Sequence, residues 1–136
     1  MNQAVMTQAA RRAYQATQVQ QEDGLSLVVQ LYDGMLGYLR RGADMMADRN
    51  ALGAAESVRR AVDIVGELQA VLDLERGGEI ATNLDRLYTY CRRRIMESHL
   101  STDPSGLHEV AKLMAPMRDA WAEARVKQAA ALEAAR

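Results

Sequence analysis

Apolar residues recur along most of this chain at alternating steps of three and four positions. Side chains with this spacing share one face of an α-helix, so the pattern predicts amphipathic helices rather than strands. Four such stripes run through residues 25–46, 54–72, 80–95 and 107–124. Their members, in chain order, are Leu25, Val28, Tyr32, Met35, Leu39, Gly42 and Met46; Ala54, Val58, Ala61, Val65, Leu68 and Leu72; Ile80, Leu84, Leu87, Cys91 and Ile95; and Leu107, Val110, Met114, Met117, Trp121 and Ala124.

Helix signals fall between these stripes. Asn50 is placed to cap the second helix, and Asp103 followed by Pro104 suits the start of the fourth. Gly77 suits the left-handed position that ends a helix, so we expect the second helix to stop there. Pro116 lies inside the fourth stripe, where its missing N–H predicts a kink or a loosened turn.

The predicted fold is all-α, an antiparallel up-down four-helix bundle. Short connections favour antiparallel neighbours, and 136 residues fit one domain. We assign residues 23–125 to the bundle and residues 1–22 to a short N-terminal segment, partly mobile or helical, that packs on it. Residues 126–136 are expected to form a helical or frayed tail. Aromatic residues make up only 4 % and Phe is absent, so Ala, Leu, Val and Met must build the core.

Charge and cysteine content narrow the function. A net charge of −1 gives no general attraction for nucleic acid. One cysteine excludes an internal disulfide and suits a reducing compartment. No apolar leader begins the sequence, and no apolar run is long enough to cross a bilayer. We therefore expect a cytoplasmic protein without membrane insertion.

The sequence shows no arrangement of side chains typical of an enzyme, a metal site or a cofactor site. His99 and His108 fall on different predicted helices, and neither has a second histidine at helical spacing. The stretch "HEVAK" carries Lys112 where a zinc-protease motif needs its second histidine. Cys91 lies on an apolar stripe and is interpreted as a core residue.

Three consecutive arginines, Arg92 to Arg94, allow two interpretations. They could form a solvated helix surface, with Glu97 as the partner of Arg93 four positions away. They could also form an anion site, as in small helical mutases that bind dicarboxylates. Consecutive helix residues point in different directions, which favours the solvated surface.

Tyrosines flank the third stripe. Tyr88 lies on one shoulder, near Ala81, and Tyr90 lies on the other with Asn83 and Arg94. Such tyrosines either line the edge of a core, with the ring buried and the hydroxyl in water, or form the wall of a groove for an apolar peptide. The sequence leaves both possibilities open.

Several segments together resemble a known family. They are "LYDGML" at 31–36, "RRAVDIVGEL" at 59–68, "RGGEIATNLDRLYTYCRRRI" at 76–95 and "DAW" at 119–121. With these segments the chain resembles the FliS family, the bacterial flagellar secretion chaperones for flagellin. The resemblance extends over about residues 13–124, and the long third segment is its most specific part.

The resemblance implies a chaperone without enzymatic activity or cofactor. It implies binding of the disordered C-terminal segment of flagellin in the cytoplasm, protection against premature polymerisation, and delivery to components of the flagellar export gate. The free chain is expected to be a monomer or a weak dimer. The alternatives are an adaptor bundle with another amphipathic partner and, less favoured, a small helical enzyme that uses Arg92–Arg94.

The expected binding site is an apolar groove with residues from three helices. The candidate groove residues are Tyr32, Gly34, Ile64, Leu68, Leu72, Ile80, Asn83, Leu84, Leu87 and Tyr88. By analogy with the family, Tyr14 and Val19 would cover the groove. Gly34 lies on the shoulder of the first stripe, where another backbone could approach, whereas Gly37 lies opposite the core.

Overall fold

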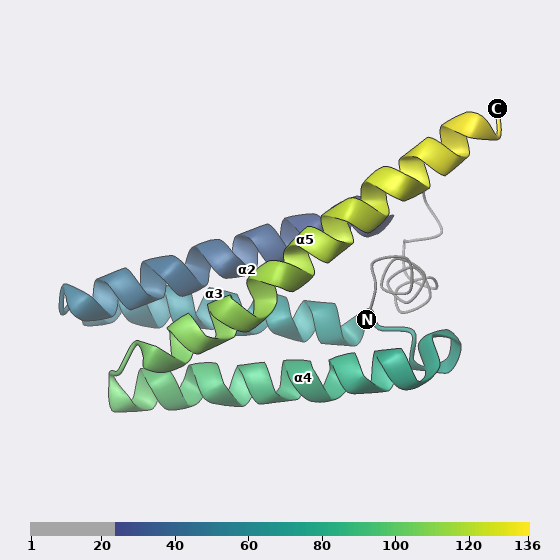
Figure 1. Cartoon of the computed structure of the whole chain (residues 1–136). Helices are drawn as coiled ribbons and strands as arrows, with labels where there is room; N and C mark the ends of the chain where they lie inside the picture. The colour runs from purple at the N-terminus through teal and green to yellow at the C-terminus, as the bar shows by residue number, and fades with distance from the viewer. Residues whose placement is uncertain (1–23) are drawn as a thin grey trace.

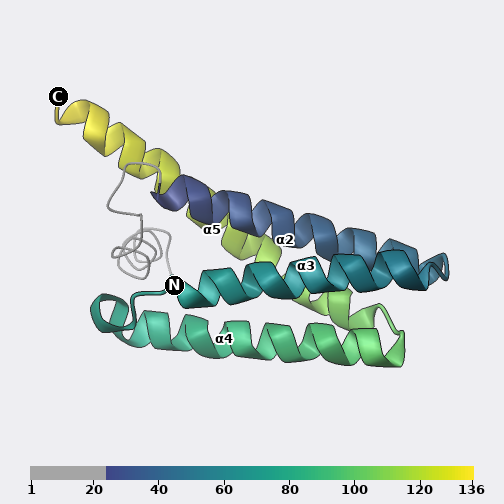
Figure 2. The same cartoon turned by 180° about the vertical axis from the view of Figure 1, so that it is seen from behind.

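The computed structural model describes residues 24–136, which form four α-helices and no strand. The helices are α2 (Gly24–Ala47), α3 (Ala51–Ala70), α4 (Leu74–Ser101) and α5 (Ser105–Ala134). Each helix packs on the next with opposite direction, and α5 returns to pack on α2 (Figures 1 and 2). The prediction of an all-α helical bundle is confirmed. The predicted N-terminal segment, with Tyr14 and Val19, lies outside the described residues.

The predicted stripes form most of the core. All seven positions of the first stripe are buried, as are the second stripe up to Leu68 and the fourth except Met117. Leu72 and Met117 are only partly buried and pack against the core from its edge. Periodicity therefore identified the inward face of α2, α3 and α5.

The centre of the third stripe was predicted incorrectly. In α4 the buried positions run through Ala81, Leu84, Tyr88, Cys91 and Ile95, while Ile80 and Leu87 lie on the flank and are partly buried. Tyr88 has no exposed surface, whereas the sequence leaves open a hydroxyl in water or a place in the wall of a groove. A tyrosine can be buried completely when its hydroxyl has a partner, and the hydroxyl of Tyr32 lies 2.6 Å away.

Two predicted helix starts are confirmed. The Asn50 side chain accepts a hydrogen bond from the Gly53 N–H at 2.9 Å and caps α3. The Asp103 carboxylate accepts one from the Ser105 N–H at 3.0 Å, and Pro104 already has helical dihedral angles. Both side chains satisfy N–H groups that have no partner within the helix.

The predicted end of the second helix is wrong. Helix α3 stops at Ala70, and Asp73 already caps the next helix by accepting a hydrogen bond from the Arg76 N–H at 2.9 Å. The glycine with positive φ is Gly78, at φ 56° and ψ −134°, and not Gly77. Helix α4 begins directly after Asp73 because its carboxylate accepts a hydrogen bond from an N–H that has no partner within the helix. Gly78 therefore lies inside α4, where it bends this helix and does not end α3.

Helix α5 is continuous through Pro116, and the kink or loosened turn at this residue stays a prediction. The tail beyond residue 125 is helical up to Ala134, and Figure 1 shows it extending past the other helices. Within residues 24–136, no helix is sufficiently long and apolar to cross a membrane.

Candidate functional site

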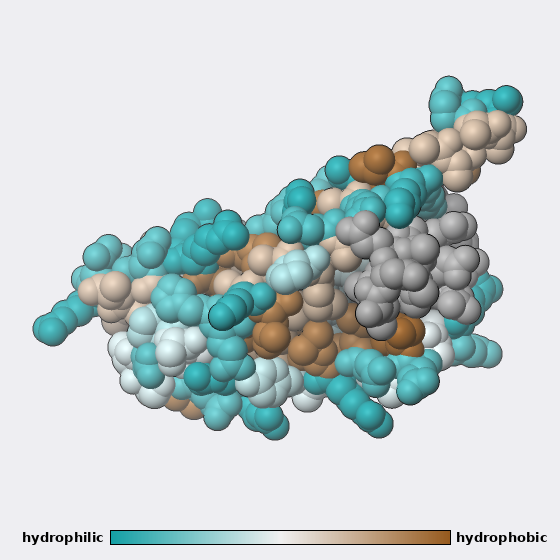
Figure 3. Space-filling view, viewed as in Figure 1, coloured by the Kyte–Doolittle hydropathy of each residue, from teal (hydrophilic) through white to brown (hydrophobic). Residues whose placement is uncertain are grey.

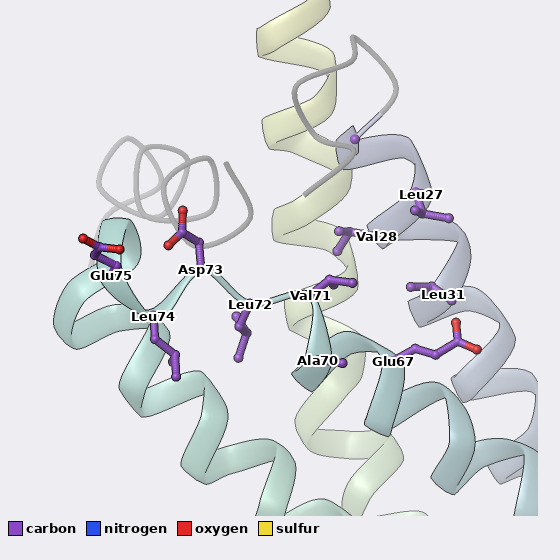
Figure 4. Close-up of a pocket in the computed structure, with 11 residues that line it drawn as sticks. Leu27, Val28, Leu31, Glu67, Ala70, Val71, Leu72, Asp73, Leu74 and Glu75 are labelled. Carbon is purple, nitrogen blue, oxygen red and sulfur yellow. The ribbon is translucent and has the colours of Figure 1, made fainter. Parts of the chain in front are cut away.

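A pocket of about 760 Å³ lies at the end of the bundle where α2 begins, α3 ends and α4 begins (Figure 4). Its walls come from the start of α2, from the end of α3 with the connection that follows it, and from the start of α4. The lining residues are Gly24, Leu27, Val28, Leu31, Glu67, Ala70, Val71, Leu72, Asp73, Leu74 and Glu75. The size is within the range of sites that hold a ligand or a few side chains of a partner.

The walls of the pocket are mainly aliphatic, and two of its leucines face solvent. Leu27 on α2 is 37 % exposed and Leu74 at the start of α4 is 52 % exposed. Leu31, Val71 and Leu72 are partly buried and connect the pocket to the core. Figure 4 shows Leu27 and Leu31 on one side and Leu74 on the other, with Leu72 between them. Exposed leucines gathered in a concave site are typical of a surface that a partner covers.

Local sequence explains why the pocket is open. Helix α3 ends at Ala70, so Val71 and Leu72 enter a short connection instead of another helical turn. Asp73 begins α4 at once, which places Leu74 at an exposed first position. At Gly78 the backbone takes dihedral angles that side chains strongly disfavour, and α4 changes direction.

A second apolar surface lies between α4 and α5. These helices are in contact near their connecting turn, where Gly106 packs against Ser98 and Arg94. Figures 1 and 2 show them diverging toward their other ends, and Figure 3 shows apolar side chains gathered between them. Ile80 and Leu87, the partly buried residues on the flank of α4, lie beyond this contact.

Glu109 of α5 joins the two helices where they are in contact. It accepts hydrogen bonds from the Tyr90 hydroxyl and from the Arg94 guanidinium, the latter at 2.9 Å. These two hydrogen bonds lower the pKa of the Glu109 carboxyl, and the Tyr90 pKa is raised by the same carboxylate. The cluster fixes α4 to the first turns of α5 only.

The structure distributes the ten predicted groove residues over three environments. Tyr32, Leu68, Leu84 and Tyr88 belong to the core, and Asn83 is exposed on α4. The partly buried ones are Gly34, Ile64, Leu72, Ile80 and Leu87. Leu72 is the predicted residue that lines the pocket.

Gly34 has a specific neighbour. A Cβ placed there would lie 3.3 Å from Cδ1 of Ile64, so the glycine makes room for a side chain of α3 and not for another backbone. Two of the predicted groove residues are therefore in contact with each other, across the α2–α3 interface.

Sequence reasoning missed Leu27, Leu31 and Leu74, and with them the acidic residues of the pocket. Leu27 and Leu31 lie four positions apart, outside the first core stripe. Such a surplus apolar pair beside an already complete stripe is the signal that could have identified them. Leu74 has no comparable signal, because its exposure depends on where α3 ends.

The three arginines do not converge on one site. Arg92 donates to the Gln69 side chain at 3.1 Å, Arg93 lies over the Tyr90 ring, and Arg94 pairs with Glu109. Each guanidinium is directed to a different neighbour, which agrees with the interpretation as a solvated helix surface.

Comparison with known proteins identifies the family. The model of the family described as "Flagellar protein FliS" matches residues 6–129. The chain belongs to the FliS family. Its relatives include the flagellar secretion chaperone FliS of Escherichia coli K12, which is 39 % identical over 98 residues, covering 71 % of this chain and 72 % of the relative. The corresponding protein of Salmonella typhimurium is 35 % identical over 96 residues, covering 70 % and 71 %. FliS of Bacillus subtilis is 29 % identical over 112 residues, covering 82 % and 83 %.

FliS proteins are chaperones and not enzymes, and the resemblance inferred from the sequence motifs is confirmed. Among residues 24–136, no group of three or more His, Cys, Asp or Glu side chains is arranged to hold a metal ion.

Proposed function

We propose that this chain binds the disordered C-terminal segment of flagellin in the cytoplasm, prevents its premature polymerisation and delivers it to components of the flagellar export gate. The support is membership in a family whose curated relatives are named flagellar secretion chaperones. The observation that carries the proposal is the aliphatic pocket with solvent-facing Leu27 and Leu74.

The physical argument is burial of apolar surface. A disordered amphipathic segment exposes side chains that associate with other copies unless a partner covers them. The pocket and the flank of α4 offer aliphatic surface for this purpose. In this proposal the accessible groove residues are Gly34, Ile64, Leu72, Ile80, Asn83 and Leu87, and the core residues beneath them are Tyr32, Leu68, Leu84 and Tyr88.

Calorimetry with a synthetic peptide of the flagellin C-terminal segment tests the proposal. Binding by apolar burial gives a negative heat-capacity change and a modest dependence on salt. Replacing both Leu27 and Leu74 by serine is expected to weaken binding at least tenfold, about 1.4 kcal/mol. Leu52→Ser with Leu100→Ser is the matched control, because these leucines are 85 % and 79 % exposed and do not line the pocket.

Each alternative function gives a different result. An adaptor for another partner leaves the flagellin peptide unbound. An anion site built on the arginines gives strongly salt-sensitive binding that Arg94→Ala abolishes. Equal losses of affinity in the pocket variant and the control would show that the peptide does not bind in this pocket.

A further inference from the structure

The pocket is acidic as well as apolar. Among the described residues that line it, Glu67, Asp73 and Glu75 carry carboxylates and none is basic. In Figure 4, Glu67 lies beside Leu31 on one side, and Asp73 and Glu75 lie on the other. The carboxylates therefore flank the aliphatic walls on both sides. The whole chain has a net charge of only −1, so this is a local feature.

Within residues 24–136, one of the three pocket carboxylates, that of Asp73, has an ion-pair partner. Over residues 24–136, neither Glu67 nor Glu75 forms an ion pair. The Asp73 side chain is only 9 % exposed, and its two oxygens differ. Oδ1 caps α4, whereas Oδ2 is buried without a hydrogen bond and forms an ion pair with Arg76, whose Nε lies 3.7 Å away. Glu67 and Glu75, in contrast, are exposed and remain accessible to a cationic side chain of a partner.

We propose that the pocket binds a basic amphipathic segment, whose aliphatic side chains enter between Leu27 and Leu74 while lysine or arginine side chains on its flanks meet Glu67 and Glu75. The inference rests on the proposed function in that the segment is taken to be part of the client. Apolar contact supplies the affinity, and the carboxylates select against acidic segments, because like charges beside a binding surface are repulsive.

Two model peptides test this chemistry without reference to flagellin. One is a leucine–lysine amphipathic helix of about 15 residues, and the other has glutamate at every lysine position. The wild-type chain is expected to bind the lysine peptide more tightly. Replacing both Glu67 and Glu75 by glutamine should reduce this preference about tenfold, or about threefold for each carboxylate at a partly solvated site. The preference should also decrease between about 0.05 M and about 0.5 M salt.

The matched control is Asp44→Asn with Asp48→Asn. It removes the same charge from exposed positions at the opposite end of α2. Circular dichroism and thermal unfolding check the fold of both variants. Replacing exposed carboxylates by amides is expected to change the helix content and the unfolding temperature little.

The outcomes separate the inference from the proposed function. Equal affinity for the two peptides, or an equal loss of preference in the control variant, would overturn the inference. The flagellin peptide is measured with the same variants. If it binds independently of Glu67 and Glu75, flagellin binding stands and the inference fails. If it does not bind although the lysine peptide is preferred, the proposed function fails and the acidic selectivity of the pocket stands.

Discussion

The hydroxyl oxygens of Tyr32 and Tyr88 lie 2.6 Å apart inside the bundle and join α2 to α4. The Tyr32 ring also packs against Trp121 of α5, with the ring centroids 6.1 Å apart. Burial raises the pKa of the Tyr32 hydroxyl far above its usual value. Three helices therefore share one aromatic cluster beneath the apolar surface of α4.

The tyrosine pair predicts non-additive stability changes. Tyr32→Phe or Tyr88→Phe leaves a buried hydroxyl without this partner, so each should cost about 1–2 kcal/mol. The double variant should lose less than the sum, because it removes both hydroxyls together. Urea unfolding followed by the fluorescence of Trp121, the single tryptophan, measures all three. Strict additivity would show that the hydroxyls do not stabilise each other.

Gly34 and Gly37 should respond in opposite ways. Gly34→Leu forces side-chain atoms into Ile64 and should destabilise by about 1–3 kcal/mol. At Gly37, the nearest atom to an added Cβ is the mobile end of Arg41 at 3.8 Å, so Gly37→Ala should stabilise by about 0.5–1 kcal/mol. Thermal unfolding distinguishes them. A stable Gly34→Leu variant with unchanged flagellin binding would remove Gly34 from the proposed groove.

A side chain at position 106 should destabilise the contact between α4 and α5. An added Cβ would lie 2.9 Å from the Arg94 carbonyl oxygen and 2.7 Å from Cβ of Ser98, so α4 and α5 would have to separate. Gly106→Ala is expected to cost about 1–3 kcal/mol. Gly66→Ala is the control, since a Cβ there meets nothing within 4 Å, and it should stabilise slightly. Similar unfolding midpoints for the two variants would contradict the close approach of α4 and α5.

Cys91 should be unreactive in the folded protein. Its side chain has no exposed surface, and burial raises the thiol pKa from 9.0 to about 11. Iodoacetamide at neutral pH should modify it only after denaturation, because the thiolate is the reactive form. Rapid labelling of the native protein would indicate that α4 opens locally.

The same pKa shift predicts a pH dependence of stability. The folded state holds the thiol proton more tightly than the unfolded state, so this contribution is complete below pH 9 and is lost as the pH rises toward 11. Cys91→Ala should therefore flatten the decline in the free energy of unfolding over this interval. An identical slope in both proteins would contradict the assigned cause.

Much of the architecture was predictable from sequence because the information is local. A repeat of three and four positions identifies the inward face of a helix wherever it lies, and Asn50 and Asp103 act on N–H groups two or three residues away. Family motifs spread over most of the chain identified the FliS family for the same reason: they depend on residue order alone.

What the sequence did not determine depends on contacts between distant residues. Tyr88 is in the core because Tyr32, on another helix, supplies a hydrogen-bond partner for its hydroxyl. No local sequence pattern predicts that these two hydroxyls meet. The pocket exists because α3 ends at Ala70 and α4 turns at Gly78, which places Leu74 opposite Leu27. Periodicity specifies which side of each helix is apolar. Only packing of the complete bundle decides which apolar residues remain uncovered, because that depends on where neighbouring helices end and diverge.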